Sequence, residues 1–256
     1  MITNIIELEN VVLTYPGIGI GSIKDFLSGS VKKRPQIGIE RIDFHRPNAI
    51  DGVSLEIPGG SKFGILGHNG SGKSTLLALI LGIMRPNKGI VRIKGRPVGL
   101  LEMGSGFHPE LSGKENILLH LSILGIRLAD GEKLIPAIEE FCELGEALSY
   151  PLKTYSSGMI TRLAFSVLCH VPADIFIVDE VIAVGDYSFQ KKCLIFMENF
   201  SKNGGTIVFV AQDPNRLREF CDYGLCLREG KVSASGDMDY VAQKYIEDME
   251  KRLQNT

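Results

Sequence analysis

Glycines, a lysine and hydroxyl residues stand at a spacing that suits phosphate binding between Gly67 and Thr75. The segment Gly67-His68-Asn69-Gly70-Ser71-Gly72-Lys73-Ser74 fits the pattern GxxxxGK[ST]. Glycines let the backbone curl until successive N–H groups point at one spot, and the N-terminus of a following helix adds partial positive charge. The pattern predicts a nucleoside triphosphate site in which Lys73 reaches the β- and γ-phosphates, the Ser74 hydroxyl binds Mg²⁺ and Thr75 adds a phosphate contact.

The flanking elements decide between this interpretation and a glycine-rich turn that carries a lysine by chance. Phe63 to Leu66 has the composition of a short buried strand, and Ser74 to Met84 has the length and composition of a helix. Because a strand precedes the loop and a helix follows it, we favour the phosphate loop. No chemistry of its own is predicted for His68. The expected nucleotide contacts are Gly67, His68, Asn69, Gly70, Ser71, Gly72, Lys73, Ser74 and Thr75.

Two acidic residues end a second apolar strand. Four apolar residues separate Asp174 from the pair Asp179 and Glu180. Asp179 is predicted to hold the Mg²⁺ shell, directly or through water. Glu180 leaves the opposite face of the strand and could polarise an attacking water as general base. Paired acids at a strand end are also common as solvated charges. The motif indicates a Mg²⁺ and catalytic site only because a phosphate loop precedes it in the sequence.

The elements that must position these residues alternate between strands and helices. This alternation favours an α/β core with a mainly parallel sheet, into which residues 112–170 are inserted as a helical block. Residues 17–49 form another insertion, with a short amphipathic segment at Ser22 to Ser30. Strands are expected at Ile5–Leu13, Val53–Ile57, Phe63–Leu66, Ile90–Lys94, Asp174–Val178, Thr206–Ala211, Leu225–Leu227 and Lys231–Ala234, and helices at Ser74–Met84, within 112–148, at Thr161–His170 and at Asp237–Leu253.

Composition excludes several classes of protein. The 256 residues carry a net charge of −2, which predicts no attraction to nucleic acid. The longest apolar runs, such as Leu76 to Met84, fall short of the roughly 20 residues that cross a membrane. The N-terminus lacks the features of a signal peptide. The five cysteines are scattered and never spaced as CxxC, so we expect reduced, packed thiols. We therefore expect a cytosolic protein that meets a membrane only through a partner.

A third motif, Tyr155-Ser156-Ser157-Gly158-Met159, precedes the acidic strand. With it the sequence resembles the ATPase subunits of ABC transporters, whose signature motif is usually LSGGQ. Nearly the whole chain takes part in the resemblance, from the phosphate loop to Ala183-Val184-Gly185-Asp186 in the place of the D-loop. It implies one ABC-type P-loop NTPase domain over 1–256, with ATP and Mg²⁺ as cofactors, an inserted helical subdomain, an N-terminal antiparallel β part and a closing helix at 237–256.

The resemblance also implies a dimer. A small turn at a helix N-terminus can bind the γ-phosphate of a nucleotide held by a second copy, so Ser156, Ser157 and Gly158 would act in trans. Ser156 could equally cap the following helix, and the two interpretations are compatible.

Other positions are assigned through the family alone. Tyr15 is the candidate for stacking on adenine, with an ordinary strand-end tyrosine as the alternative. Family members usually carry a glutamine in the loop after the first sheet, where this chain has Glu102, a possible Mg²⁺ ligand. They also carry a switch histidine, where this chain has Gln212. The last departure predicts slow hydrolysis.

Several details resemble bacterial exporters of O-antigen, capsule or teichoic acid. They are the YSSGM signature, the segment from Leu101 to Ile117, the continuation from Val181 to Asp186 and the insertion 17–49. This implies a homodimer with two copies of a membrane permease that handles a lipid-linked polysaccharide at the cytoplasmic face of the inner membrane. Some such exporters append a carbohydrate-binding domain, and we expect none here.

Two alternatives remain at this stage. A soluble ABC ATPase acting on DNA or ribosomes usually has a long coiled coil or two cassettes, and neither is evident in this sequence. A regulatory subunit that binds ATP without efficient turnover gains support from Gln212, while Lys73 and Glu180 argue against it.

Overall fold

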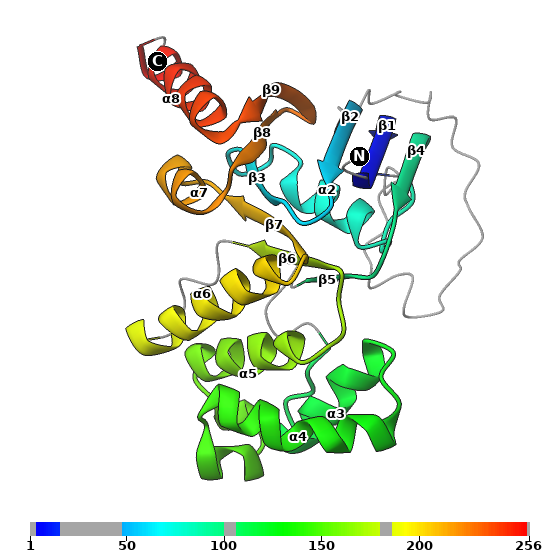
Figure 1. Cartoon of the computed structure of the whole chain (residues 1–256), viewed down its shortest axis with the longest axis vertical. Helices are drawn as coiled ribbons and strands as arrows, with labels where there is room; N and C mark the ends of the chain where they lie inside the picture. The colour runs from blue at the N-terminus through cyan, green and yellow to red at the C-terminus, as the bar shows by residue number, and fades with distance from the viewer. Residues whose placement is uncertain (1–3, 16–47, 100–105, 180–185, 255–256) are drawn as a thin grey trace, which may run out of the picture.

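The computed structural model describes residues 4–15, 48–99, 106–179 and 186–254, and the side chains as far as 251. Two sheets and the helices on them form an upper lobe, and a helical lobe lies at the other end of the molecule (Figure 1). The antiparallel sheet has the order β2-β1-β4, with β1 Asn4–Leu13, β2 Ile50–Pro58 and β4 Lys88–Ile93. It is the N-terminal antiparallel part that the sequence predicts.

The second sheet has the strand order β5-β6-β7-β3-β8-β9. Its first five strands run parallel, and β9 pairs antiparallel with β8. Strands separated along the chain are neighbours in space, as helical crossovers between parallel strands require. The strands are β3 Lys62–Leu66, β5 Pro97–Gly99, β6 Ile175–Asp179, β7 Thr206–Ala211, β8 Tyr223–Arg228 and β9 Lys231–Asp237.

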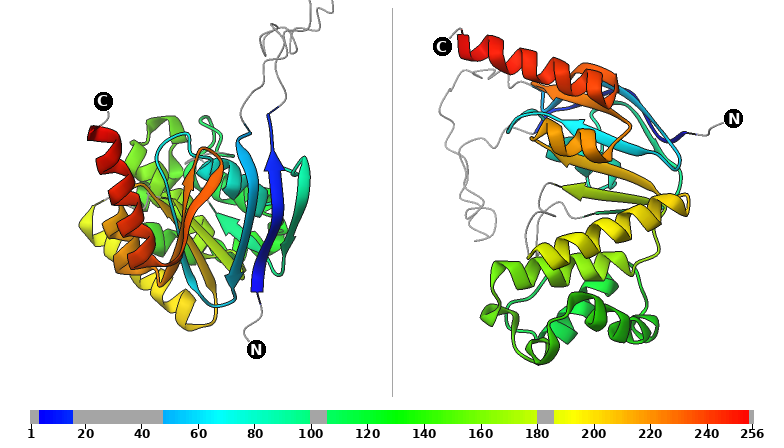
Figure 2. Two further views of the ribbon diagram at one scale, coloured as in Figure 1. Left: turned by 90° about the horizontal axis from the view of Figure 1, so that it is seen from above. Right: turned by 60° about the vertical axis from the view of Figure 1, so that its left-hand side comes forward.

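Alternate residues of the central strands face two different cores. Ile175 and Ile177 of β6 pack with the antiparallel sheet and with α2 (Lys73–Ile80). Phe176 and Val178 face the opposite core, which contains the helices of the lower lobe. Both faces of β6 are apolar because both are covered, as is usual for a parallel strand. Figure 2 shows the two sheets from above, with α2 between them.

The lower lobe is built from α3 (Gly113–Ile123), α4 (Leu128–Cys142) and α5 (Ser157–Cys169). Ser112 and Glu115 form a reciprocal capping box at the start of α3. The helical pattern expected over 112–148 is broken, because Gly125 has a φ of 78° between α3 and α4. Two 3₁₀ turns, Gly145–Ser149 and Leu152–Thr154, then lead into α5.

Three elements have no counterpart among the expected ones: β5, α6 (Tyr187–Lys202) and α7 (Pro214–Phe220). Both helices carry start signals in the sequence. The side chain of Asp186 accepts a hydrogen bond from the N–H of Phe189, and Asp213 caps α7 directly before Pro214. The closing helix α8 (Met238–Gln254) starts one residue later than expected.

Helix α2 ends four residues before the expected Met84. Leu81 caps the helix, and Gly82 follows with a φ of 71°. The N–H of Ile83 then donates to the carbonyl of Ala78 at 2.9 Å, which closes the helix.

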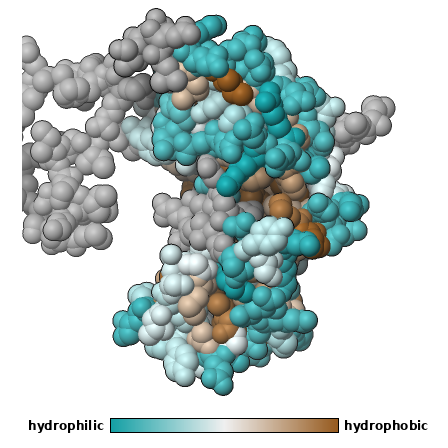
Figure 3. Space-filling view, turned by 90° about the vertical axis from the view of Figure 1, so that its left-hand side faces the viewer, coloured by the Kyte–Doolittle hydropathy of each residue, from teal (hydrophilic) through white to brown (hydrophobic). Residues whose placement is uncertain are grey.

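The face drawn in Figure 3 is mainly polar where it is coloured, with hydrophobic side chains in separate small areas. Among the helices of the described residues, none has the length and apolar character that a membrane span needs.

Candidate nucleotide-binding site

The carboxyl ends of three neighbouring strands meet at one edge of the parallel sheet. In the pairing register Asp179 of β6 lies beside Val210 of β7, and Leu66 of β3 lies beside Ala211. The residues that follow Leu66 and Ala211 are Gly67 and Gln212. Motifs far apart in the sequence therefore converge where ligands bind in open α/β sheets.

The phosphate loop has the backbone that its glycines permit. Gly70 has a φ of 78° and Gly72 a φ of 107°. At Gly72 an added Cβ would lie 2.6 Å from the carbonyl oxygen of Ala49, so a side chain is excluded by backbone as well as by torsion. Directly after Gly72 the chain enters α2, whose first residue is Lys73. The helix N-terminus is thus placed as a phosphate site requires.

The side chain of Lys73 curls back onto the loop. Its Nζ donates to the carbonyl oxygens of Gly67 and of His68, the latter at 3.0 Å. Ser71 is 1% exposed, and its hydroxyl has no hydrogen-bond partner among the described residues. A buried hydroxyl without a partner is costly, so this loop has polar capacity left for a ligand.

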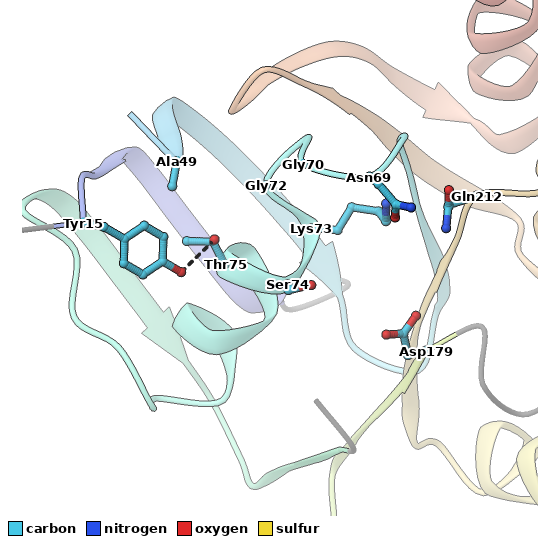
Figure 4. A pocket seen from close by; sticks show the side chains of 10 residues that line it. All are labelled: Tyr15, Ala49, Asn69, Gly70, Gly72, Lys73, Ser74, Thr75, Asp179 and Gln212. Atoms are coloured by element: carbon cyan, nitrogen blue, oxygen red, sulfur yellow. Dashed lines mark hydrogen bonds between the residues drawn. The ribbon is translucent and has the colours of Figure 1, made fainter. Parts of the chain in front are cut away.

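A cavity of about 360 Å³ opens beside this loop. That volume lies within the usual range for small-molecule sites, about 300–1,000 Å³. Figure 4 shows Lys73 extended toward Asn69 and Gln212, with Asp179 opposite Ser74 and the ring of Tyr15 at the other end. The lining residues are Tyr15, Ala49, Asn69, Gly70, Gly72, Lys73, Ser74, Thr75, Asp179 and Gln212. Ala49 is the one lining residue that the sequence did not suggest, because it contributes shape and no chemistry.

The signature turn, Ser156 to Gly158, does not line this cavity. It lies at the start of α5, where the Ser156 hydroxyl accepts a hydrogen bond from the N–H of Met159 at 3.2 Å. The capping role predicted for Ser156 is therefore confirmed. The structure separates the turn from the pocket of its own chain, and an action in trans stays a prediction.

Tyr155 directly precedes that turn and anchors it to the chain before α5. Its hydroxyl donates to the carbonyl oxygen of Ala147 at 2.6 Å, and burial raises its pKa to about 12. The phenol therefore stays protonated at any physiological pH and serves packing. Burial likewise raises the pKa of the Cys193 and Cys221 thiols to about 12, so neither is a ready nucleophile.

Two predicted site residues, Glu102 and Glu180, lie outside the described residues, as does the segment from Ser22 to Ser30. Their roles stay predictions from the sequence. Among the residues that the structure describes, no three His, Cys, Asp or Glu side chains gather into an all-protein metal site, which Mg²⁺ bound beside phosphates does not need.

Comparison with known proteins settles the family. A family model described as ABC transporter matches residues 50–183. The chain belongs to this family. The matched region runs from the first residue of β2 past Asp179, and so contains the phosphate loop, the signature turn and the acidic strand.

The curated relatives of this chain include ATP-binding proteins of export systems. The O-antigen export system ATP-binding protein of Klebsiella pneumoniae is 38% identical over 248 residues, which cover 96% of this chain and 98% of that protein. The protein of the same description from Myxococcus xanthus is 46% identical over 78% of this chain and 46% of its own length. The teichoic acids export ATP-binding protein of Bacillus anthracis is 41% identical over 79% of this chain and 37% of its own length.

Solved structures agree on the fold. An ATP-binding subunit of an ABC transporter superposes with a TM-score of 0.73 at 19% identity, covering 98% of this chain and 99% of that one. A dimeric ATP-binding cassette in a post-hydrolysis state, bound to ADP and Pi, superposes with a TM-score of 0.69 at 21% identity, covering 91% and 98%. The predicted ABC-type α/β fold with its inserted helical part is confirmed.

Proposed function

We propose that this chain binds ATP with Mg²⁺ and hydrolyses it as the paired motor subunit of an exporter for a lipid-linked polysaccharide. The observation that carries the ATP site is the convergence of Lys73, Ser74, Asp179 and Gln212 on one cavity at the carboxyl ends of β3, β6 and β7. The export role rests on relatives that are ATP-binding proteins of O-antigen and teichoic acid export systems.

Each pocket residue has a distinct task in this proposal. Lys73 and the N-terminus of α2 bind phosphate oxygens. Ser74 and Asp179 would hold Mg²⁺ through their side-chain oxygens. Tyr15 lies at the far end of the cavity, where a base would stack. Bound Mg²⁺ would supply positive charge beside the phosphates, and Glu180 would orient the attacking water.

A second copy completes the proposed site. The signature turn of one chain would face the nucleotide of its partner, because it lies away from the cavity of its own chain. Two such chains would sit at the cytoplasmic face of the inner membrane against two permease subunits, which handle the polysaccharide. The similarity of this chain to ATP-binding proteins of O-antigen and teichoic acid export systems supports this assembly.

Calorimetric titration of the full chain with ATP, with and without Mg²⁺, tests the nucleotide site. We expect saturable binding that Lys73→Ala weakens and that EDTA weakens. Absence of ATP binding would overturn the proposal. For the export role, we would delete the gene and follow surface polysaccharide, expecting polymer to accumulate inside. Surface polymer at wild-type levels would reject that role.

A further inference from the structure

A charge network of three side chains, Arg162, Asp186 and Glu143, joins three helices in the lower part of the molecule. Arg162 of α5 donates from Nη1 to Asp186 Oδ2 at 3.0 Å and from Nη2 to Glu143 Oε2 at 2.9 Å. Its Nε donates to the carbonyl oxygen of Cys142 at 3.1 Å. One guanidinium thus contacts the C-terminus of α4 and the N-cap residue of α6 at once, which its planar fork of donors permits.

The carboxylates of Asp186 and Glu143 are 59% and 49% exposed, whereas the guanidinium of Arg162 that they share is mostly covered. The Arg162 side chain is only 17% exposed, and its guanidinium carbon lies 5.0 Å from the ring centroid of Phe189. Charge-assisted hydrogen bonds gain strength as water is excluded, and a buried guanidinium that loses its partners is destabilised. Each partner is fixed as well. Asp186 caps α6 through its other carboxylate oxygen, and Glu143 ends α4 in the left-handed conformation.

The network connects two functional segments that are far apart in the sequence. Arg162 lies on the helix whose first turn is the signature turn. Asp186 is the first described residue after β6, the strand that ends at Asp179 in the ATP cavity. None of the described residues in the network lines that cavity. The ion pair therefore ties the helix that begins with the signature turn to the start of α6, which follows the acidic strand in the sequence.

We infer that Arg162 is a positioning residue for ATP turnover, which acts through Asp186 and not on the nucleotide directly. This rests on the proposed function, in which the signature turn serves the nucleotide of the second copy and Glu180 serves that of its own chain. When the Arg162–Asp186 pair is intact, the helix of the signature turn and the start of α6 are held together, so closure of the dimer presents them in one fixed relation. When the pair is lost, ATP still binds to the phosphate loop, but the composite site is misaligned and turnover falls.

The chain offers variants that separate this role from simple stabilisation. Asp186→Asn removes the charge while keeping a side chain that caps α6 equally well. Lys192→Gln is the matched control. Lys192 donates to Glu143 Oε1 at 3.0 Å and to the carbonyl oxygens of Glu140 and Phe141, so it ties α6 to α4 without contacting α5.

The experiment measures kcat, the ATP dissociation constant and Tm for the full chain. We expect Arg162→Gln and Asp186→Asn each to lower kcat by about tenfold, with ATP affinity changed less than about threefold and no further loss in the double variant. Arg162→Lys should recover part of kcat, because it restores charge without the fork. Lys192→Gln should keep kcat within about twofold of wild type although it lowers Tm.

Several results would overturn the inference. Additive losses in the double variant would mean that the two residues act separately. An equal loss of kcat in Lys192→Gln would mean that general loosening of the lobe is responsible. Wild-type kcat in Asp186→Asn would reject the role even if Arg162→Gln failed to fold. A wild-type chain without any ATP turnover would instead reject the proposed function itself.

Discussion

The hydroxyl oxygen of Tyr15 lies 3.1 Å from the hydroxyl oxygen of Thr75, which joins the end of β1 to the helix after the phosphate loop. This hydrogen bond holds the Tyr15 ring at the mouth of the cavity, where the side chain is 46% exposed. In the proposed site, the ring would thus be oriented before a base arrives. A pre-ordered ring loses little freedom on binding, so the contact favours affinity.

The first prediction separates the ring of Tyr15 from its hydroxyl. Base–aromatic stacking contributes about 1–3 kcal/mol, so Tyr15→Ala should weaken ATP binding by about 5- to 150-fold. Tyr15→Phe should bind ATP within about threefold of wild type, since only one hydrogen bond between partly exposed groups is lost. Calorimetry with ATP and with inorganic triphosphate makes the comparison. Equal loss of affinity for both ligands would show that Tyr15 supports the loop and does not stack on the base.

The second prediction concerns Lys73. Its amine pairs with phosphate oxygens in every bound state, so Lys73→Ala should weaken ATP binding itself and not only turnover. Charged hydrogen bonds contribute about 1.5–3 kcal/mol, which corresponds to a loss of about 10- to 150-fold in affinity. Lys94→Ala, which removes an exposed lysine that directly follows β4, is the control. Unchanged affinity of Lys73→Ala would refute the phosphate role.

The third prediction concerns Glu180, the proposed general base. Glu180→Gln keeps the size of the side chain and removes its basicity. ATP affinity should be preserved while turnover falls by roughly 10²–10⁴-fold. In this proposal the closed dimer opens only after ATP is hydrolysed. The variant should therefore accumulate as an ATP-bound dimer. Analytical ultracentrifugation with ATP and Mg²⁺ measures this, and hydrolysis at the wild-type rate would show that the assignment is wrong.

The fourth prediction follows from a buried histidine in the lower lobe. His120 is 6% exposed and packs edge-on against Phe107, with ring centroids 4.9 Å apart. Burial lowers its pKa below the ordinary value of 6.5, so the unfolded chain binds the proton more tightly than the folded chain. Stability that is present above pH 6.5 is therefore lost as the pH falls below it.

Denaturant titrations at pH 7.5 and pH 5.5 test this claim. We expect the wild-type free energy of unfolding to fall between these values, and His120→Phe to show a flatter dependence. The carboxylates with lowered pKa values, such as Glu143 beside Lys192 and Asp130 beside Lys133, lose their contribution only below their ordinary range near 4. They therefore do not mask the effect of His120. An identical pH slope in the two proteins would contradict the prediction.

The sequence predicted the phosphate loop and the strand before Asp179 because each motif is contiguous and its chemistry is tied to local backbone. The convergence of Gln212 on the same cavity depends on the order of β6, β7 and β3, which no local pattern encodes. Family resemblance supplied the switch position for that reason.

The missed helices had a different cause. Helix α6 buries only a narrow stripe, formed by Phe189, Cys193 and Met197, so its apolar pattern is weak. Its N-cap is Asp186, which in the sequence is assigned to the D-loop and so does not stand out as a helix start. The network around Arg162 could not be foreseen either, since its members are up to 43 residues apart and meet only when α4, α5 and α6 are packed.

The final prediction concerns Gln212, which directly follows β7 and lines the cavity with Lys73 and Asp179. A histidine here could become charged as the transition state develops, whereas an amide can donate a hydrogen bond but cannot become charged at any accessible pH. Charge-assisted hydrogen bonds are about twice as strong as neutral ones, so we expect slow hydrolysis with ATP binding largely preserved. Gln212→His should raise kcat by roughly tenfold if the gain is about 1.4 kcal/mol, while KM changes little. Gln212→Ala is the matched control and should lower kcat, because it removes the amide donor. An unchanged or lower kcat in Gln212→His would show that turnover relies on Glu180 without a switch residue, or that another side chain fills that role.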